Sequence, residues 1–122
     1  MANDFKRFTV SSVNTSVGAS ASAVYTVPAG AGSTALESIV IGITLANKTS
    51  TGVTASVFLD NYTGSNDVYI VKDATIPAGS SLEVMSGNKI VLQNDGTTGD
   101  VLRVSSGTST AIDTTISVLE DV

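Results

Sequence analysis

The segment Leu36–Asn47, LESIVIGITLAN, constrains the fold of this chain more than any other stretch. Side chains alternate between the two faces of a strand, so its large aliphatic residues are predicted to share one face: Ile39, Ile41, Ile43 and Leu45. The residues between them are small and only half polar, which indicates that the second face is covered as well. β-branched residues pack well on a pleated surface and fit a helix poorly. We therefore expect a central β-strand here.

The rest of the chain is predicted to form strands beside this one, separated by turn sequences rich in Gly, Asn and Asp. Two hairpins are expected, one joining 36–47 to 53–60 and one joining 82–85 to 89–93 through residues 86–88. Further strands are expected at 5–13, 23–27, 68–72, 101–105 and 111–119. The sequence thus predicts an all-β fold, an antiparallel β-sandwich or jelly roll of about eight strands, in a single domain over residues 1–122.

The residue types that the chain lacks limit its chemistry. Its 122 residues include no cysteine, histidine or tryptophan, which removes disulfides, the usual general base and every Cys/His zinc site. A formal net charge of −5 disfavours binding to nucleic-acid phosphates. No segment has the pattern of a secretory signal or the ~20 apolar residues of a membrane span. We expect a protein made in a cytoplasm, with no cofactor and with neither nucleic acid nor membrane as partner.

Paired carboxylates are the first enzymatic hypothesis, since Glu37 and Glu83 would flank a glycosidic bond if the fold brought them to the right separation. Both lie at predicted strand positions beside apolar residues. A carboxylate at such a position usually points outward into solvent. No serine or lysine lies in a recognisable nucleophile motif either. We therefore expect no enzymatic activity and no catalytic residue.

Two turn sequences are candidate recognition loops because they gather side chains with oxygen ligands. The first contains Asp60, Asn61, Tyr62, Asn66 and Asp67, and the second contains Asn94, Asp95 and Asp100. Neither matches the twelve-residue calcium loop, and Asn and Asp are common in turns for backbone reasons alone. We expect no metal site, while the binding of a glycan or of calcium by these loops stays open. Tyr25 and Tyr69 lie on predicted strands and are candidates for the core.

The segment 1–13 is predicted to be an N-terminal strand or arm. Phe8 and Val10 fall on one face of it, and Lys6 and Arg7 supply two of the six positive charges of the chain. One interpretation is that these charges keep an edge strand soluble. The other, which the charge asymmetry of the segment motivates, is that Phe5, Lys6, Arg7 and Phe8 dock on an acidic partner.

The order of motifs resembles that of a group of small bacteriophage virion proteins found in marine and cyanobacterial phages. The motifs are YTVPAG, ESIVIGITLAN, VTASVFLDN, VYIVKDATIPAGSSLEVMSGNKIVLQ, DVLRVSS and TTISVLE, which together cover residues 25–120. The most specific part is IPAGSSLEV…GNKIVL, residues 76–92. The resemblance implies a β-sandwich structural protein of the particle and transfers no catalytic residue.

The function that follows is that of a capsid decoration, or cement, protein, which binds the outer capsid surface and stabilises the shell. Its partners would be the major capsid protein and copies of itself, with a homotrimer expected, and it would be found in the virion after assembly in the host cytoplasm. The alternative is a tail, baseplate or tail-fibre component with a receptor- or glycan-binding role. Copy number per particle separates these two hypotheses.

Overall fold

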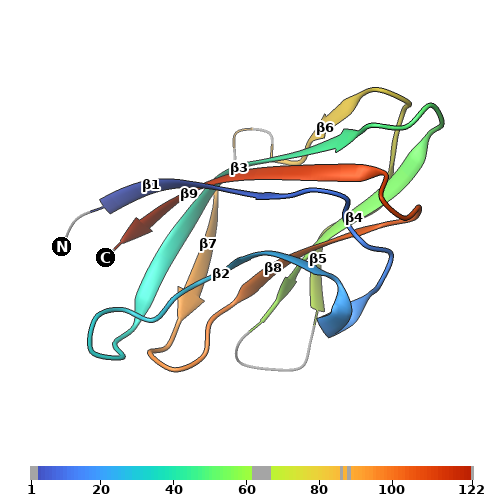
Figure 1. Cartoon of the computed structure of the whole chain (residues 1–122). Coiled ribbons are helices and arrows are strands. Elements are labelled where there is room, and N and C mark those ends of the chain that lie inside the picture. The colour runs from blue at the N-terminus through green and yellow to red at the C-terminus, as the bar shows by residue number, and fades with distance from the viewer. Residues whose placement is uncertain (1–2, 62–66, 86, 88, 122) are drawn as a thin grey trace.

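Two antiparallel sheets form the protein (Figure 1). The computed structural model describes residues 3–61, 67–85, 87 and 89–121, and within them there are nine strands. The first sheet has the order β1 (Asn3–Val10), β9 (Ile112–Asp121) and β3 (Leu36–Asn47), with β6 (Ser81–Glu83) and β7 (Ile90–Asn94) both paired to β3. The second sheet has the order β2 (Ser22–Thr26), β8 (Val101–Ser106), β4 (Val53–Asp60) and β5 (Asp67–Ile76). A single 3₁₀ turn at Gly18–Ser20 is the helical structure among these residues, so the predicted all-β fold is confirmed.

The first strand pairs with the last, and each further pair joins strands closer to the middle of the chain. β1 pairs with β9, β2 with β8, β3 with β6 and β7, and β4 with β5, all antiparallel. Successive pairs alternate between the first and the second sheet, as in a long ribbon rolled around a core. The predicted antiparallel sandwich is confirmed, and its strand order is that of a jelly roll.

A β-bulge near Ile41 divides β3 into two halves. The alternation of inward and outward side chains shifts by one residue at the bulge. Val40 pairs with Val118 and Gly42 with Ser117, so Ile41 is an extra residue on β3. Before the bulge, Leu36 and Val40 point into the core, and after it Ile43 and Leu45 do. The prediction that Ile39 and Ile41 share the buried face with Ile43 and Leu45 is therefore wrong. Ile39 is half-buried and Ile41 is 39% exposed.

The predicted hairpin between 36–47 and 53–60 does not form. The strands have the expected bounds, but β3 belongs to the first sheet and β4 to the second. Both strands have an apolar face, and placing them in opposite sheets lets Leu45 and Val53 join one core. The segment 48–52 is therefore a corner between sheets.

The predicted hairpin between 82–85 and 89–93 is wrong as well. β6 pairs with residues 44–46 of β3, and β7 pairs with residues 36–40 of the same strand. The two short strands thus follow one another along a single edge of β3. This long strand offers more hydrogen-bonding edge than either short strand could offer the other.

Asn47 fixes the corner between β3 and β4 with its buried side-chain amide. Its Nδ2 donates to the carbonyls of Thr51 and Ile76 at 2.8 and 2.9 Å, and its Oδ1 accepts the Thr49 amide at 2.9 Å. Asn47 is 2% exposed, so water cannot replace these partners. One side chain therefore joins the end of β3 to the end of β5.

The substitution Asn47→Ala is predicted to lower the free energy of unfolding by about 1–3 kcal/mol, because it leaves buried backbone groups without partners. Urea denaturation measures this as a lower midpoint. The control is Gln93→Ala, which removes an exposed amide from β7. Equal midpoints for the two variants would contradict the role assigned to Asn47.

Candidate functional site

An apolar stripe crosses the outer face of the first sheet. Phe5 of β1 lies opposite Leu119 of β9, Leu119 lies opposite Ile39 of β3, and Ile39 lies opposite Val91 of β7. Residues directly opposite in antiparallel strands have side chains on the same face. Four aliphatic or aromatic side chains from four different strands therefore form one continuous row, which we call the apolar stripe, and Ile41 lies beside it.

The stripe is open to solvent, most of all at its two ends. Phe5 is 78% exposed and Val91 is 55% exposed, while Leu119 and Ile39 are half-buried between them. Exposed apolar patches that are contiguous and bordered by polar residues mark surfaces that bind other proteins. This surface is the strongest candidate site on the molecule.

Polar residues border the stripe on both sides. Arg7 and its neighbour Ser117 lie on one side, and Glu37 and its neighbour Gln93 lie on the other, all of them exposed. Polar side chains therefore flank the stripe at β1 and β9 on one side and at β3 and β7 on the other. A partner surface that fits it would be apolar along a matching line and charged at its margins.

The four N-terminal residues predicted to contact a partner do not share one face. Phe5 and Arg7 point outward and belong to the stripe and its border. Lys6 and Phe8 point toward the second sheet, where Lys6 binds Glu120 at 2.9 Å and Phe8 packs on Tyr25. Only the outward pair is available to a partner on this face of the sheet. β1 lies at the edge of the first sheet, as the edge-strand interpretation expects, but residues 11–13 are not part of the strand and residues 1–2 lie outside the described residues.

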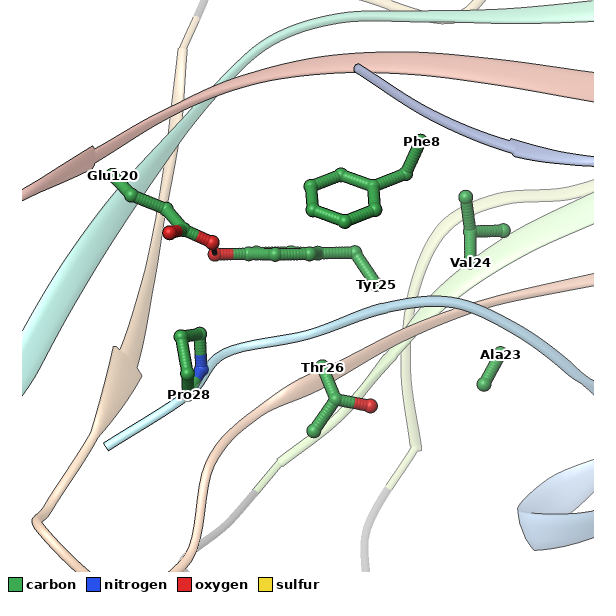
Figure 2. A pocket seen from close by; sticks show the side chains of 7 residues that line it. All are labelled: Phe8, Ala23, Val24, Tyr25, Thr26, Pro28 and Glu120. Carbon is green, nitrogen blue, oxygen red and sulfur yellow. Dashed lines mark hydrogen bonds between the residues drawn. The ribbon is translucent and has the colours of Figure 1, made fainter. Parts of the chain in front are cut away.

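A buried polar cluster joins the two sheets beneath β1 (Figure 2). The Tyr25 hydroxyl donates to Glu120 Oε2 at 2.6 Å, and Lys6 Nζ lies 2.9 Å from Glu120 Oε1. The Tyr25 hydroxyl has a single proton, so the Ser38 hydroxyl at 2.7 Å donates to it. The ring of Tyr25 packs against Phe8 with their centroids 4.7 Å apart. Both oxygens of a carboxylate that is 2% exposed are thus occupied.

The cluster raises the pKa values of two of its members, Tyr25 and Lys6, in the direction that keeps it intact. Burial, and then the hydrogen bond to Glu120, raise the pKa of Tyr25 far above its usual value. The hydrogen bond to Glu120 raises the pKa of Lys6 as well. The phenol therefore stays protonated and the ammonium stays charged at neutral pH.

An open groove of about 380 Å³ lies beside this cluster, between β1 and β2. Its lining is mostly apolar, and the one carboxylate that reaches it, Glu120, is already bound by Tyr25 and Lys6.

Glu37 and Glu83, the two carboxylates considered as a catalytic pair, do not meet. Glu83 accepts a hydrogen bond from Thr44 of β3. Glu37 lies on the same strand, and a rise of about 3.3 Å per residue places it about 23 Å from Thr44. Glycosidase carboxylates are about 5–10 Å apart.

The second predicted recognition loop uses its polar side chains to hold its own backbone. Asn94 is buried and donates to the Val27 carbonyl at 2.8 Å, while Asp100 accepts the Gln93 amide at 3.0 Å. Asp95 is exposed and accepts the amides of Thr97 and Thr98, which lower its pKa. Only Asp95 among these three residues extends into solvent. The loop is therefore organised as a turn.

The first predicted recognition loop is described at its two ends. Asp60 binds Arg103 Nε at 3.1 Å, and Asp67 is exposed at the start of β5, opposite Asp60. Asn61 is half-buried, and Tyr62 and Asn66 lie outside the described residues. Because Asp60 also pairs with Val101, this loop and the loop at 94–100 lie at the same end of the sandwich. The role of both loops in recognition stays a prediction.

Among the described residues, no group of three or more His, Cys, Asp and Glu side chains is placed to hold a metal ion. The described part of the chain also has no helix with the length and hydropathy needed to cross a membrane. Comparison with known protein families, with curated proteins and with solved structures gives no match for this chain.

The residues that sequence reasoning missed are those whose role depends on strand register. Leu119 and Val91 are ordinary strand residues until pairing aligns them with Ile39. Glu120 lies next to Leu119 at the end of β9 and was assigned no role, yet it is buried. One signal was present, since Glu120 continues the inward series of Ile112, Ile116 and Val118. A carboxylate at an inward position indicates a buried partner.

Tyr25→Phe is predicted to lower the free energy of unfolding by about 1.5–3 kcal/mol, since the lost hydrogen bond ends on a buried carboxylate. A raised pKa means that folding favours the protonated phenol. The contribution of Tyr25 is therefore complete below about pH 10, the ordinary value for tyrosine, and is lost as the pH rises through the folded value.

Denaturation at neutral pH and a near-ultraviolet titration of the tyrosines measure these two effects. Tyr69→Phe is the matched control, because Tyr69 is 40% exposed. Because the pKa of Tyr25 is raised, Tyr25→Phe is expected to remove the part of the titration at the highest pH, whereas Tyr69→Phe is expected to leave it. If Tyr25→Phe left that part of the titration unchanged, the environment assigned to Tyr25 would be wrong.

Proposed function

We propose that this protein is a structural component of a bacteriophage particle, a decoration protein that binds the outer capsid surface through its apolar stripe. The observation that carries the proposal is the stripe itself, four apolar side chains aligned across four strands and open to solvent. A surface of this kind is costly to leave in water and contributes binding energy when a partner covers it.

The position of the stripe supports a flat docking mode. It lies on the face of a sheet, so a partner need not enter a cleft or pair with a strand edge. Arg7 at its margin is exposed, so it is accessible to an acidic group of a partner, as the docking hypothesis for the N-terminal segment requires. The sequence resemblance to small phage virion proteins supports the same assignment, and the jelly-roll order is compatible with it.

The stabilising effect on a shell would come from the coupling between binding of this protein and assembly of the shell. A protein that binds only the assembled lattice stabilises that lattice by the free energy of its binding. Copies of the protein would also contact one another, and a homotrimer is the predicted state. No reactive group is needed for such a role.

The alternative is a tail, baseplate or tail-fibre component with receptor- or glycan-binding activity. Many copies per particle would support decoration, whereas a few copies would support the tail. Quantifying the protein band against the major capsid protein in purified particles distinguishes the two.

Replacement of Phe5 or Val91 by lysine is predicted to weaken binding to particles at least about tenfold, since a buried Phe or Val side chain contributes about 1.5–3 kcal/mol. Co-sedimentation of the purified protein with particles stripped of it measures the change. The control is Thr9→Lys, which adds the same charge on the same exposed face of β1, away from the stripe. Undiminished binding by both stripe variants would refute docking through this face.

A further inference from the structure

A hollow of about 190 Å³, lined by both polar and apolar groups, lies on the outer face of the second sheet, on the opposite side of the sandwich from the apolar stripe. Its floor includes Ser56 of β4 and Ser105 of β8, which are direct partners in the sheet. Their neighbours in sequence, Val57 and Val104, point the other way into the core. The two serines are each only 7% exposed, because the sides of the hollow rise above them.

The sides of the hollow come from two different segments. Thr15 and Val17, in the connection between β1 and β2, form part of one side, and Tyr69, Lys72 and Asp73 of β5 form part of the other. This connection passes outside the sheet. The hollow is therefore a depression built on a sheet face by a covering segment and an edge strand.

The β5 side is shaped by irregular backbone. Two register shifts occur between β4 and β5, and Asp73 has a φ of 52°, a left-handed conformation that Asp tolerates better than most residues. The Asp73 amide donates to Ser56 Oγ at 2.9 Å, which fixes this bend to the floor. Tyr69 is held against Phe58 with their ring centroids 5.1 Å apart. The side chains around the hollow are thus positioned before any ligand arrives.

The Ser105 hydroxyl lies on the floor of the hollow, in a residue that is more than nine-tenths buried. A hydroxyl both donates and accepts hydrogen bonds. A ligand in the hollow can therefore exchange hydrogen bonds with Ser105.

The charges around the hollow favour a neutral ligand. Lys72 lies 3.5 Å from Asp73 and 5.2 Å from the centre of the Tyr69 ring, so its charge is already balanced locally. An anion would meet the Asp73 carboxylate, and a cation would meet the Lys72 ammonium. What remains is a set of hydroxyls, a carboxylate that accepts hydrogen bonds and an aromatic ring, which together suit a ligand rich in hydroxyl groups and with apolar C–H faces.

We propose that this hollow binds a single neutral sugar residue, such as a terminal hexose of a glycan. A volume of 190 Å³ equals about six water molecules at about 30 Å³ each, the scale of one sugar ring. The Ser105 hydroxyl and the Asp73 carboxylate bind ring hydroxyls, and Tyr69 contacts a C–H face of the ring. The site is independent of the apolar stripe, and because it lies on the opposite sheet, both surfaces can be occupied at once.

Amide chemical shifts of the ¹⁵N-labelled protein test the proposal. The probes are methyl glycosides of the common neutral hexoses and 6-deoxyhexoses, titrated to about 50 mM, well above a millimolar dissociation constant. At least one probe is expected to shift the amides of Ser105, Tyr69 and Asp73 in a saturable way. Ser105→Val fills the floor with methyl groups and is expected to reduce the affinity at least tenfold.

The matched control is Ser117→Val, the same change at an exposed position on the outer face of the first sheet, and it is expected to bind as the parent does. The amide spectrum itself reports whether each variant is folded. Tyr69→Leu is a second variant of the hollow, which tests the proposal if Ser105→Val does not fold. The proposal is overturned if no neutral glycoside gives saturable shifts, if binding survives both hollow variants, or if only a charged sugar such as sialic acid binds. None of these results bears on particle binding through the stripe.

Discussion

The bulge at Ile41 is the constraint on which the rest of the molecule depends. It changes the phase of β3, so that Val40 and Ile43 both enter the core although they are three residues apart. Without it, Ile39 and Ile43 would face the same way, and one half of β3 would turn its apolar residues out of the sandwich. With it, Ile39 takes an outward position between Leu119 and Val91. The same irregularity therefore completes the core and creates the exposed row of apolar residues.

Much of the fold could be predicted, because strand residues carry local signals. The bounds of β3 and β4 were predicted correctly. The connections could not be predicted in the same way. A five-residue segment after a strand suits either a hairpin or a corner, and the choice depends on Asn47, whose partners include Ile76, far along the chain. Long-range pairing is a property of the whole fold.

The candidate sites were harder to predict for the same reason. Phe5 was identified from its position in a basic segment, but its apolar neighbours come from β9, β3 and β7. Asn94 and Asp100 looked like ligands in sequence and are turn residues that bind backbone groups. Ser105 had no signal at all, since serine is common in this chain and its place on the floor of the hollow depends on the segment that covers the sheet. The candidate surfaces of this protein depend on strand register and on the segment that covers the second sheet.

The pairing of β1 with β9 has a consequence for how the chain reaches this structure in the cell. The ribosome releases β1 first among the nine strands and its partner last, so the first sheet cannot close during most of synthesis. Until β9 emerges, Phe8 and Val10 have no completed sheet to pack into. The first sheet is therefore expected to close late and folding to be slow, as in other all-β proteins of high contact order. During that wait, Lys6 and Arg7 would protect the nascent edge from joining the wrong chain.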